Sequence, residues 1–167
     1  MVALFPVVCA APLSKEVMDR FIEQNDDVDE DEWCLVFVDS IDNYYDEPSR
    51  APIENDSNPN SPFIGKTPQE CHQLLLKLVE NTESEIMPSY FAILDERSTR
   101  DDTVLLVCAA RGLDGEILGW PTVRATFQAS AIALMLYHSG HSSVEEDVER
   151  AESEPDHVYR GQWSTVK

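Results

Sequence analysis

Apolar residues along the chain fall into short runs of strand length, separated by segments whose apolar positions recur at helical spacing. The opening run MVALFPVVC predicts a first strand. After it, Ser14 can cap a helix with one buried face, formed by Val17, Met18, Phe21 and Ile22. The next run, WCLVFV at residues 33–38, lacks polar alternation, which is typical of a strand covered on both faces. We therefore predict that this strand is central in its sheet.

The second half of the chain contains one strongly signalled helix and several further strands. A helix should begin at Thr67-Pro68-Gln69-Glu70, because the Thr and Glu side chains can cap each other's amides and proline loses no hydrogen bond there. Strands are predicted at residues 90–94 and 103–109, which a short charged turn should join as an antiparallel pair, and at the alternating segment 121–127. Residues 132–137 fit either a strand or the end of a helix. Ser142 or Ser143 should cap an acidic helix that ends near residue 153, and residues 158–159 could add a short strand.

This order of elements predicts a single mixed α/β (α+β) domain, with about five to six strands, three helices and a sheet that is not wholly parallel. Residues 41–66 stand apart because they are rich in Asn, Asp, Pro and Ser, with NDSNPNSP at their centre. A connection of this length without secondary structure is unusual in a compact domain, and is either functional or disordered. We predict one domain over residues 1–161 with a long flexible insertion at 41–66, followed by a polar tail at 162–167.

The charge of the chain limits the kinds of partner that it can bind. The formal net charge of −20, from 32 acidic against 12 basic residues, repels phosphate backbones and anionic lipid surfaces. We therefore expect neither nucleic acid nor membranes as partners, whereas a basic protein could dock on the acidic faces. No segment approaches the about 20 apolar residues that span a bilayer. The dispersed cysteines form no C-x-x-C pair and are expected to be reduced, which favours a cytoplasmic protein: Cys9, Cys34, Cys71 and Cys108.

Several short stretches carry a family resemblance. They are LVFVDS, GKTPQE, the pair FAILDE and TVLLVC, and HVYRG at residues 157–161. In this order the chain, over residues 33–161, resembles a family of small acidic α/β domains of unknown function found in bacteria and fungi. The resemblance implies an α/β fold and brings no catalytic residues with it. The insertion that follows Asp39 departs from the shorter link of that family.

Two carboxylates stand at predicted strand ends. Asp39 and Asp95 each follow an apolar run, and ligands of α/β sheets bind outside the carboxyl ends of strands. If Asp39 and Asp95 share a crevice, they could hold Mg²⁺ together with Glu96. These three carboxylates are therefore the candidate catalytic residues. The other interpretation is that an acid at a strand exit enters a turn or caps the next element.

Other candidate residues concern metal binding and recognition. His138, His141 and Glu145 have a spacing that zinc could use, but Gly140 favours a surface turn, so we predict no metal site and no cofactor. The exposed aromatics expected to bind a partner are Tyr44, Tyr45 and Trp120, unless they pack the insertion onto the body.

The sequence contains no signature of nucleotide binding or nucleophilic catalysis. Our first hypothesis is therefore a non-catalytic binding or accessory domain that acts on a protein partner, which leans against an enzyme. One alternative is a small metal-assisted hydrolase or another pathway enzyme that uses the strand-end carboxylates. A second alternative is an acidic inhibitor or immunity-type protein that blocks a basic site.

Overall fold

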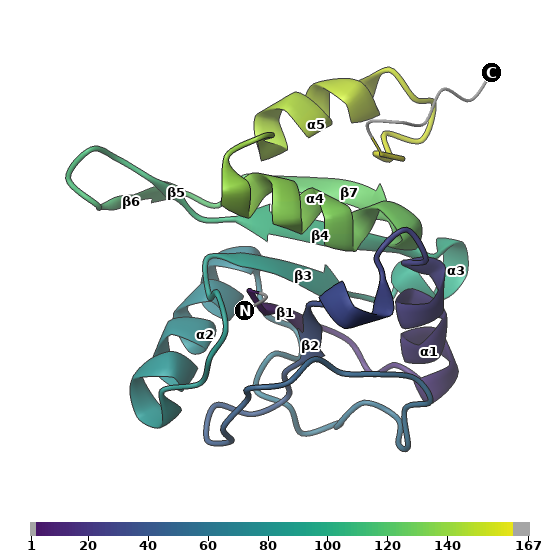
Figure 1. The fold of residues 1–167 in the computed structure, drawn as a ribbon, viewed down its shortest axis with the longest axis vertical. Coiled ribbons are helices and arrows are strands. Elements are labelled where there is room, and N and C mark those ends of the chain that lie inside the picture. The colour runs from purple at the N-terminus through teal and green to yellow at the C-terminus, as the bar shows by residue number, and fades with distance from the viewer. Residues whose placement is uncertain (1–2, 162–167) are drawn as a thin grey trace.

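A computed structural model describes residues 3–161 and has a mixed five-stranded sheet at its centre (Figure 1). The strand order is β2-β1-β3-β4-β7. Strands β2 and β3 run parallel to β1, whereas β4 is antiparallel to both β3 and β7. The strands comprise β1 (Phe5–Cys9), β2 (Leu35–Phe37), β3 (Tyr90–Leu94), β4 (Thr103–Cys108) and β7 (Thr122–Thr126). The predicted mixed α+β class and the antiparallel pairing of β3 with β4 are confirmed.

Helices cover both faces of this sheet. One face packs against α1 (Lys15–Gln24) and α4 (Phe127–Ser139), and the other packs against α2 (Pro68–Thr82). A fourth helix, α5 (Val144–Glu152), lies beside β7 at one edge of the sheet (Figure 1). Two short helical turns, η1 (Glu30–Glu32) and α3 (Ser98–Asp101), complete the helices. Because β2 and β3 both run parallel to β1, the carboxyl ends of β1, β2 and β3 meet at one end of the sheet.

The predicted start of α2 is confirmed in detail. The Glu70 backbone N–H donates to Thr67 Oγ1 (3.2 Å), and the Thr67 N–H donates to Glu70 Oε1 (3.0 Å), with Pro68 at the first helical position. These reciprocal hydrogen bonds satisfy amides that the first helical turn leaves without a partner. Ser14 caps α1 as predicted, and of the two candidates for α5 it is Ser143 that accepts from the Glu146 N–H.

The prediction that WCLVFV forms a central strand is wrong. Only Leu35–Phe37 form β2, and β2 is the edge strand of the sheet, next to β1. Its residues are apolar because both faces of β2 are packed against the core, not because β2 is central in the sheet. The free edge of β2 is also covered, by Ser49 of the insertion. Ser49 donates its N–H to the Leu35 carbonyl oxygen (2.9 Å) and accepts from the Phe37 N–H through its hydroxyl (2.9 Å).

The predicted number of helices is also too low. The described residues contain five α-helices where three were predicted. The ambiguous run 132–137 belongs to α4, and the alternation predicted for a strand through Phe127 stops at Thr126. The charged turn, defined here as residues 95–102, contains α3.

The insertion at 41–66 has no helix or strand and runs along the β2 edge and the strand ends (Figure 1). It is bonded to the body at several points: the Gly65 N–H donates to the Ala10 carbonyl, the Glu85 N–H donates to the Tyr45 carbonyl, and Phe63 is fully buried. The Ala51–Pro52 peptide bond is cis. The predicted polar tail at 162–167 lies outside the described residues.

Two peripheral features complete the fold. Strands β5 (Ala110–Arg111) and β6 (Ile117–Gly119) form a separate hairpin arm that projects from β4 and β7 (Figure 1). Tyr159 makes a single bridge with Ala125, so it covers part of the free edge of β7. Across residues 3–161, every helix is too short or too polar to cross a membrane.

Candidate binding pocket at the strand ends

A pocket of about 490 Å³ lies at the carboxyl ends of β1 and β2, where the insertion folds over them. This is the position at which open α/β sheets bind ligands, and the volume falls in the range of ligand pockets. We call it the strand-end pocket. Its lining comes from β1, β2, α1 and the insertion, as Val7, Cys9, Met18, Phe37, Val38, Asp39, Ser49, Arg50, Pro52, Ile53, Glu54, Asn55, Asp56, Ser57, Asn58 and Ser61.

Hydrogen bonds to the start of α1 hold the insertion over the pocket. The Leu13 N–H donates to Ser57 Oγ (2.7 Å), and the Ser57 N–H returns a bond to the Leu13 carbonyl oxygen (2.9 Å). Further along α1, Asp19 Oδ1 accepts from the Ile53 N–H (2.7 Å). These bonds connect residues more than 30 positions apart in the chain, so they position the pocket wall without any regular secondary structure.

The rim of the pocket is acidic. Asp39, Glu54 and Asp56 contribute three exposed carboxylates. The one basic residue of the lining, Arg50, directs its Nη1 towards Glu30, where it donates to the carbonyl oxygen (3.3 Å) and lies 4.0 Å from a carboxylate oxygen. Since Glu30 partly offsets the charge of Arg50, the pocket presents a net negative potential to a ligand.

The floor of the pocket is apolar, and it includes a thiol. Burial raises the pKa of Cys9 to about 12, and the nearby Asp39 carboxylate adds to this effect. The thiolate is the reactive form of cysteine, so Cys9 is neutral and unreactive at physiological pH. Cys9 therefore acts in the floor as a small apolar group rather than as a nucleophile.

Both candidate tyrosines form hydrogen bonds that connect the insertion to the body, and Tyr45 also packs against the core. The Tyr45 hydroxyl donates to Asp39 Oδ1 (3.1 Å), and the Tyr45 backbone N–H donates to Ser84 Oγ (2.9 Å). Tyr44 is 53% exposed and donates its hydroxyl hydrogen to Glu85 Oε2 (2.6 Å). Tyr45 thus orients Asp39 at the pocket, whereas Tyr44 is the more accessible ring.

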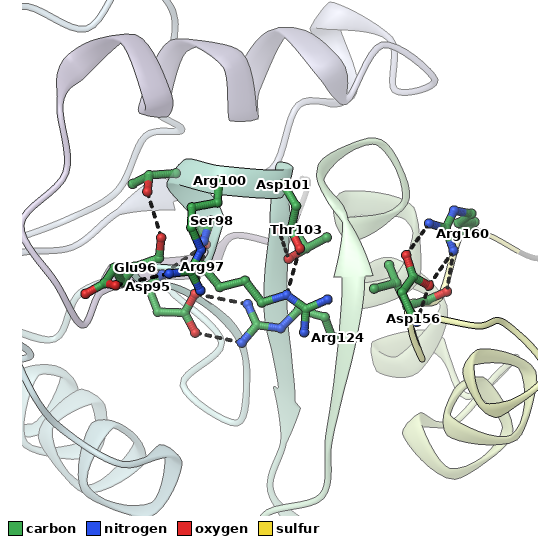
Figure 2. Close-up of polar contacts among 12 residues, drawn as sticks. Asp95, Glu96, Arg97, Ser98, Arg100, Asp101, Thr103, Arg124, Asp156 and Arg160 are labelled. Carbon is green, nitrogen blue, oxygen red and sulfur yellow. Dashed lines mark hydrogen bonds and ion pairs between the residues drawn. The ribbon is translucent and has the colours of Figure 1, made fainter.

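The other strand-end carboxylate, Asp95, belongs to a different set of contacts (Figure 2). Arg124 on β7 donates to both carboxylate oxygens of Asp95, at 3.0 and 2.7 Å, in the two-pronged geometry that guanidinium groups favour. The Ser98 hydroxyl and backbone N–H also donate to Asp95 Oδ1, each at 3.2 Å. Asp95 therefore stabilises the start of α3, in agreement with the interpretation of a strand-exit acid as a turn former.

The protonation of Asp95 reflects this environment. Burial alone would raise the pKa of Asp95, but the hydrogen bonds and charge of Arg124 and the hydrogen bonds of Ser98 outweigh it and lower the pKa below its ordinary value. Neighbouring charges in the turn pair with one another, because Arg97 binds Asp101 (2.7 Å) and Arg100 binds Glu96 (3.2 Å). The other two acids of the turn pair with arginines outside it, Asp95 with Arg124 and Asp102 with Arg20 (3.0 Å), so every charge of the turn has a partner and the turn is structural.

The structure does not bring the two candidate aspartates to one site. Asp39 lines the strand-end pocket, whereas Asp95 is absent from its lining and binds Arg124 towards β7. Glu96 is exposed and paired with Arg100. Within residues 3–161, no cluster of three His, Cys, Asp or Glu side chains could hold a metal ion.

Of the remaining candidates, the two histidines and Trp120 have structural partners. The His138 ring packs edge-on against Phe5 and Tyr90, and His141 shares a hydrogen bond with Ser139 (2.7 Å). Glu145 lies exposed in the first turn of α5. The Trp120 ring is half-buried and donates from Nε1 to Nδ1 of the buried His72 (2.9 Å), so it fixes the base of the hairpin arm to α2.

The sequence could not identify most of the pocket. Asp39 was found because it ends an apolar run, but Glu54 and Asp56 lie in a segment without periodicity and gave no signal. Arg124 was recognisable only as a charged residue on the polar face of an alternating strand, and this pattern does not indicate which residue it pairs with. Ile53 is an isolated apolar residue in the same segment and Cys9 lies within the first apolar run, so neither indicated a pocket.

Comparison of the chain with protein-family models, curated proteins and solved structures found no match. The resemblance to a family of acidic α/β domains therefore stays a prediction. Any functional conclusion has to come from the geometry of the site.

Proposed function

We propose that this chain is a non-catalytic binding domain that acts as an accessory protein for a basic protein partner. The single observation that carries the proposal is the strand-end pocket, which combines a ligand-sized volume with a net negative rim built by the insertion. The formal charge of −20 supports the same kind of partner, because it steers basic surfaces towards the protein at long range.

The covered edges of the sheet support recognition through the pocket. Partners often bind an α/β protein by adding a strand to a free sheet edge. Here Ser49 occupies the edge of β2 and Tyr159 occupies part of the edge of β7. The strand ends and the insertion are thus the more accessible recognition surface.

The alternative of a metal-assisted hydrolase receives less support from the same contacts. Its two strand-end aspartates lie in separate environments, and the carboxylate of Asp95 is occupied by Arg124 and Ser98. An inhibitor or immunity-type protein would use the acidic pocket in the same way as an accessory protein and would differ only in the identity of its target.

A titration with a defined basic peptide tests the proposal. The probe is a 12-residue Gly/Ser peptide that contains four arginines, added to ¹⁵N-labelled protein at about 0.15 M salt, where exposed charges more than about 8 Å apart are screened. We expect saturable binding with amide shifts concentrated in residues 39–61. The absence of saturable binding would contradict the proposal, whereas shifts spread evenly over the acidic α5 as well would mean that binding does not depend on the strand-end pocket.

A further inference from the structure

We infer that the strand-end pocket takes a single basic side chain of the partner, with arginine preferred to lysine, whose stem lies on the apolar floor and whose charge reaches the rim. This inference rests on the proposed function and names the chemical group that the pocket recognises. Three features of the pocket carry it: an apolar floor, free carboxylate oxygens, and polar side chains around the mouth.

The floor fits an aliphatic stem. Phe37 and Ile53 are partly exposed in the lining, above the buried side chains of Val7 and Met18. Arginine and lysine bury their methylene groups along apolar surfaces while the charged end stays at a polar boundary. A small inorganic cation would leave this floor without a partner.

The rim offers unused hydrogen-bond acceptors. Asp39 Oδ1 accepts from Tyr45 and Asp56 Oδ1 accepts from the Lys15 N–H (3.0 Å), but within residues 3–161 the second oxygen of each carboxylate accepts no hydrogen bond. Glu54 forms no hydrogen bond or ion pair with any residue of the same range. Three carboxylates therefore present free oxygens, and Arg50 is turned towards Glu30.

The arrangement favours arginine over lysine. A guanidinium group has five N–H donors in a planar fork and can bind two carboxylates at once, whereas an ammonium is compact and more strongly hydrated. The acceptors come from the end of β2 and from the insertion, so they are spread around the rim rather than gathered at one point. A forked cation can reach spread acceptors better than a point charge can.

The mouth of the pocket fits a side chain that is attached to a peptide. Asn55 and Asn58 belong to the lining and are both exposed, whereas Ser57 beside them is already hydrogen-bonded to Leu13. Asparagine side chains can donate to carbonyl oxygens and accept from N–H groups of an extended backbone. The residues that flank the inserted arginine would lie across these side chains.

The experiment compares peptides that differ only at one side chain. Nine-residue Gly/Ser peptides with a central arginine, lysine, citrulline or norleucine are titrated into ¹⁵N-labelled protein at about 0.15 M salt, and affinity is read from amide shifts. Citrulline keeps the shape of arginine without its charge, and norleucine keeps only an aliphatic stem. We expect the arginine peptide to bind about tenfold more tightly than the citrulline peptide, because charge-assisted hydrogen bonds are the stronger kind.

Matched variants localise the effect. Glu54→Gln and Asp39→Asn should each lower the affinity for the arginine peptide by about threefold, which is the size of effect expected for one exposed ion pair. The control is Glu145→Gln with Glu149→Gln on α5, where both residues are exposed, and it should leave the affinity unchanged. All changed side chains are exposed, so folding should persist, and circular dichroism checks this.

The failure of this inference can be distinguished from the failure of the proposed function. Binding of the four-arginine peptide that responds equally to the pocket variants and to the α5 control would overturn the pocket inference alone. Equal affinity for arginine and citrulline peptides would also overturn it. If no basic peptide saturates the protein, the proposed function itself is wrong. Free butylguanidinium that binds as tightly as the arginine peptide would overturn the assignment to a protein side chain.

Discussion

The ion pair between Asp95 and Arg124 connects the end of β3 to β7 across the intervening strand β4. Both side chains are largely removed from solvent, with 28% and 16% of their surface exposed. Removing one member of such a pair leaves the other partly desolvated and without its counter-charge, which costs more than an exposed pair contributes. The contact is therefore expected to matter for stability even though it lies outside the pocket.

We predict that Arg124→Gln lowers the free energy of unfolding at pH 7 by about 1–3 kcal/mol, with the cost reduced from that of a fully buried pair by partial exposure. The pKa of Asp95 is lowered in the folded protein, so its contribution is present above the unfolded pKa and is lost as pH falls through the folded value. The difference between wild type and variant should therefore shrink below about pH 4. Urea unfolding at pH 7 and at pH 3 measures both effects.

The control for this prediction is Arg160→Gln. Arg160 binds Asp156 through two contacts (3.0 and 2.6 Å) and Glu154 through a third (3.1 Å), but all three side chains are more than a third exposed. Exposed pairs contribute little, so this variant should resemble wild type at pH 7. A loss for Arg124→Gln no larger than that for Arg160→Gln would show that the Asp95 pair is not structurally important.

At the scale of elements, Thr126 decides where β7 ends and α4 begins. Its backbone pairs with Thr103 at the end of β7, and its hydroxyl accepts from the Ala129 N–H (3.3 Å) as the cap of α4. The sequence alternates through Phe127, and Phe127 is buried in the helix as it would have been in a strand. Burial alone therefore could not distinguish the two structures, and the cap was the missing signal.

Replacing this cap tests its role. Thr126→Val keeps the β-branched shape that suits β7 but removes the acceptor, so we expect a loss of about 1 kcal/mol in the free energy of unfolding. Thr126→Ser keeps the acceptor and should lose less. Urea unfolding of both variants gives the comparison, and equal losses would mean that shape rather than capping matters at this position.

The elements that could be predicted are those whose signals are local. The capping box of α2 and the apolar runs of β3 and β4 depend on neighbours in the chain, and both were identified. The position of β2 could not be predicted, because its cover comes from Ser49 and α1, which periodicity does not reveal. The pocket could not be predicted for the same reason. Its wall depends on hydrogen bonds between segments that are distant in the chain and have no periodicity, such as the bond between Leu13 and Ser57.

At the scale of the whole molecule, the charge of −20 has opposite consequences for folding and for binding. Self-repulsion among like charges destabilises the compact state, whereas the same field attracts a basic partner. Salt screens both effects, since the Debye length falls from about 30 Å at 0.01 M to about 8 Å at 0.15 M. Raising the salt concentration should therefore stabilise the fold and weaken the proposed binding of a basic peptide.

We predict that the Tm rises by roughly 2–4 °C between 0.01 and 0.15 M NaCl, which corresponds to about 1 kcal/mol for a chain of this size. Over the same range, affinity for the four-arginine peptide should fall. KCl at equal ionic strength is the control and should give the same Tm, because screening does not depend on the identity of a monovalent cation. A Tm that falls with salt would mean that ion pairs such as Asp95–Arg124 outweigh the net repulsion. The acidic surface would then stabilise the fold through its ion pairs, and recognition of a partner would not be needed to explain it.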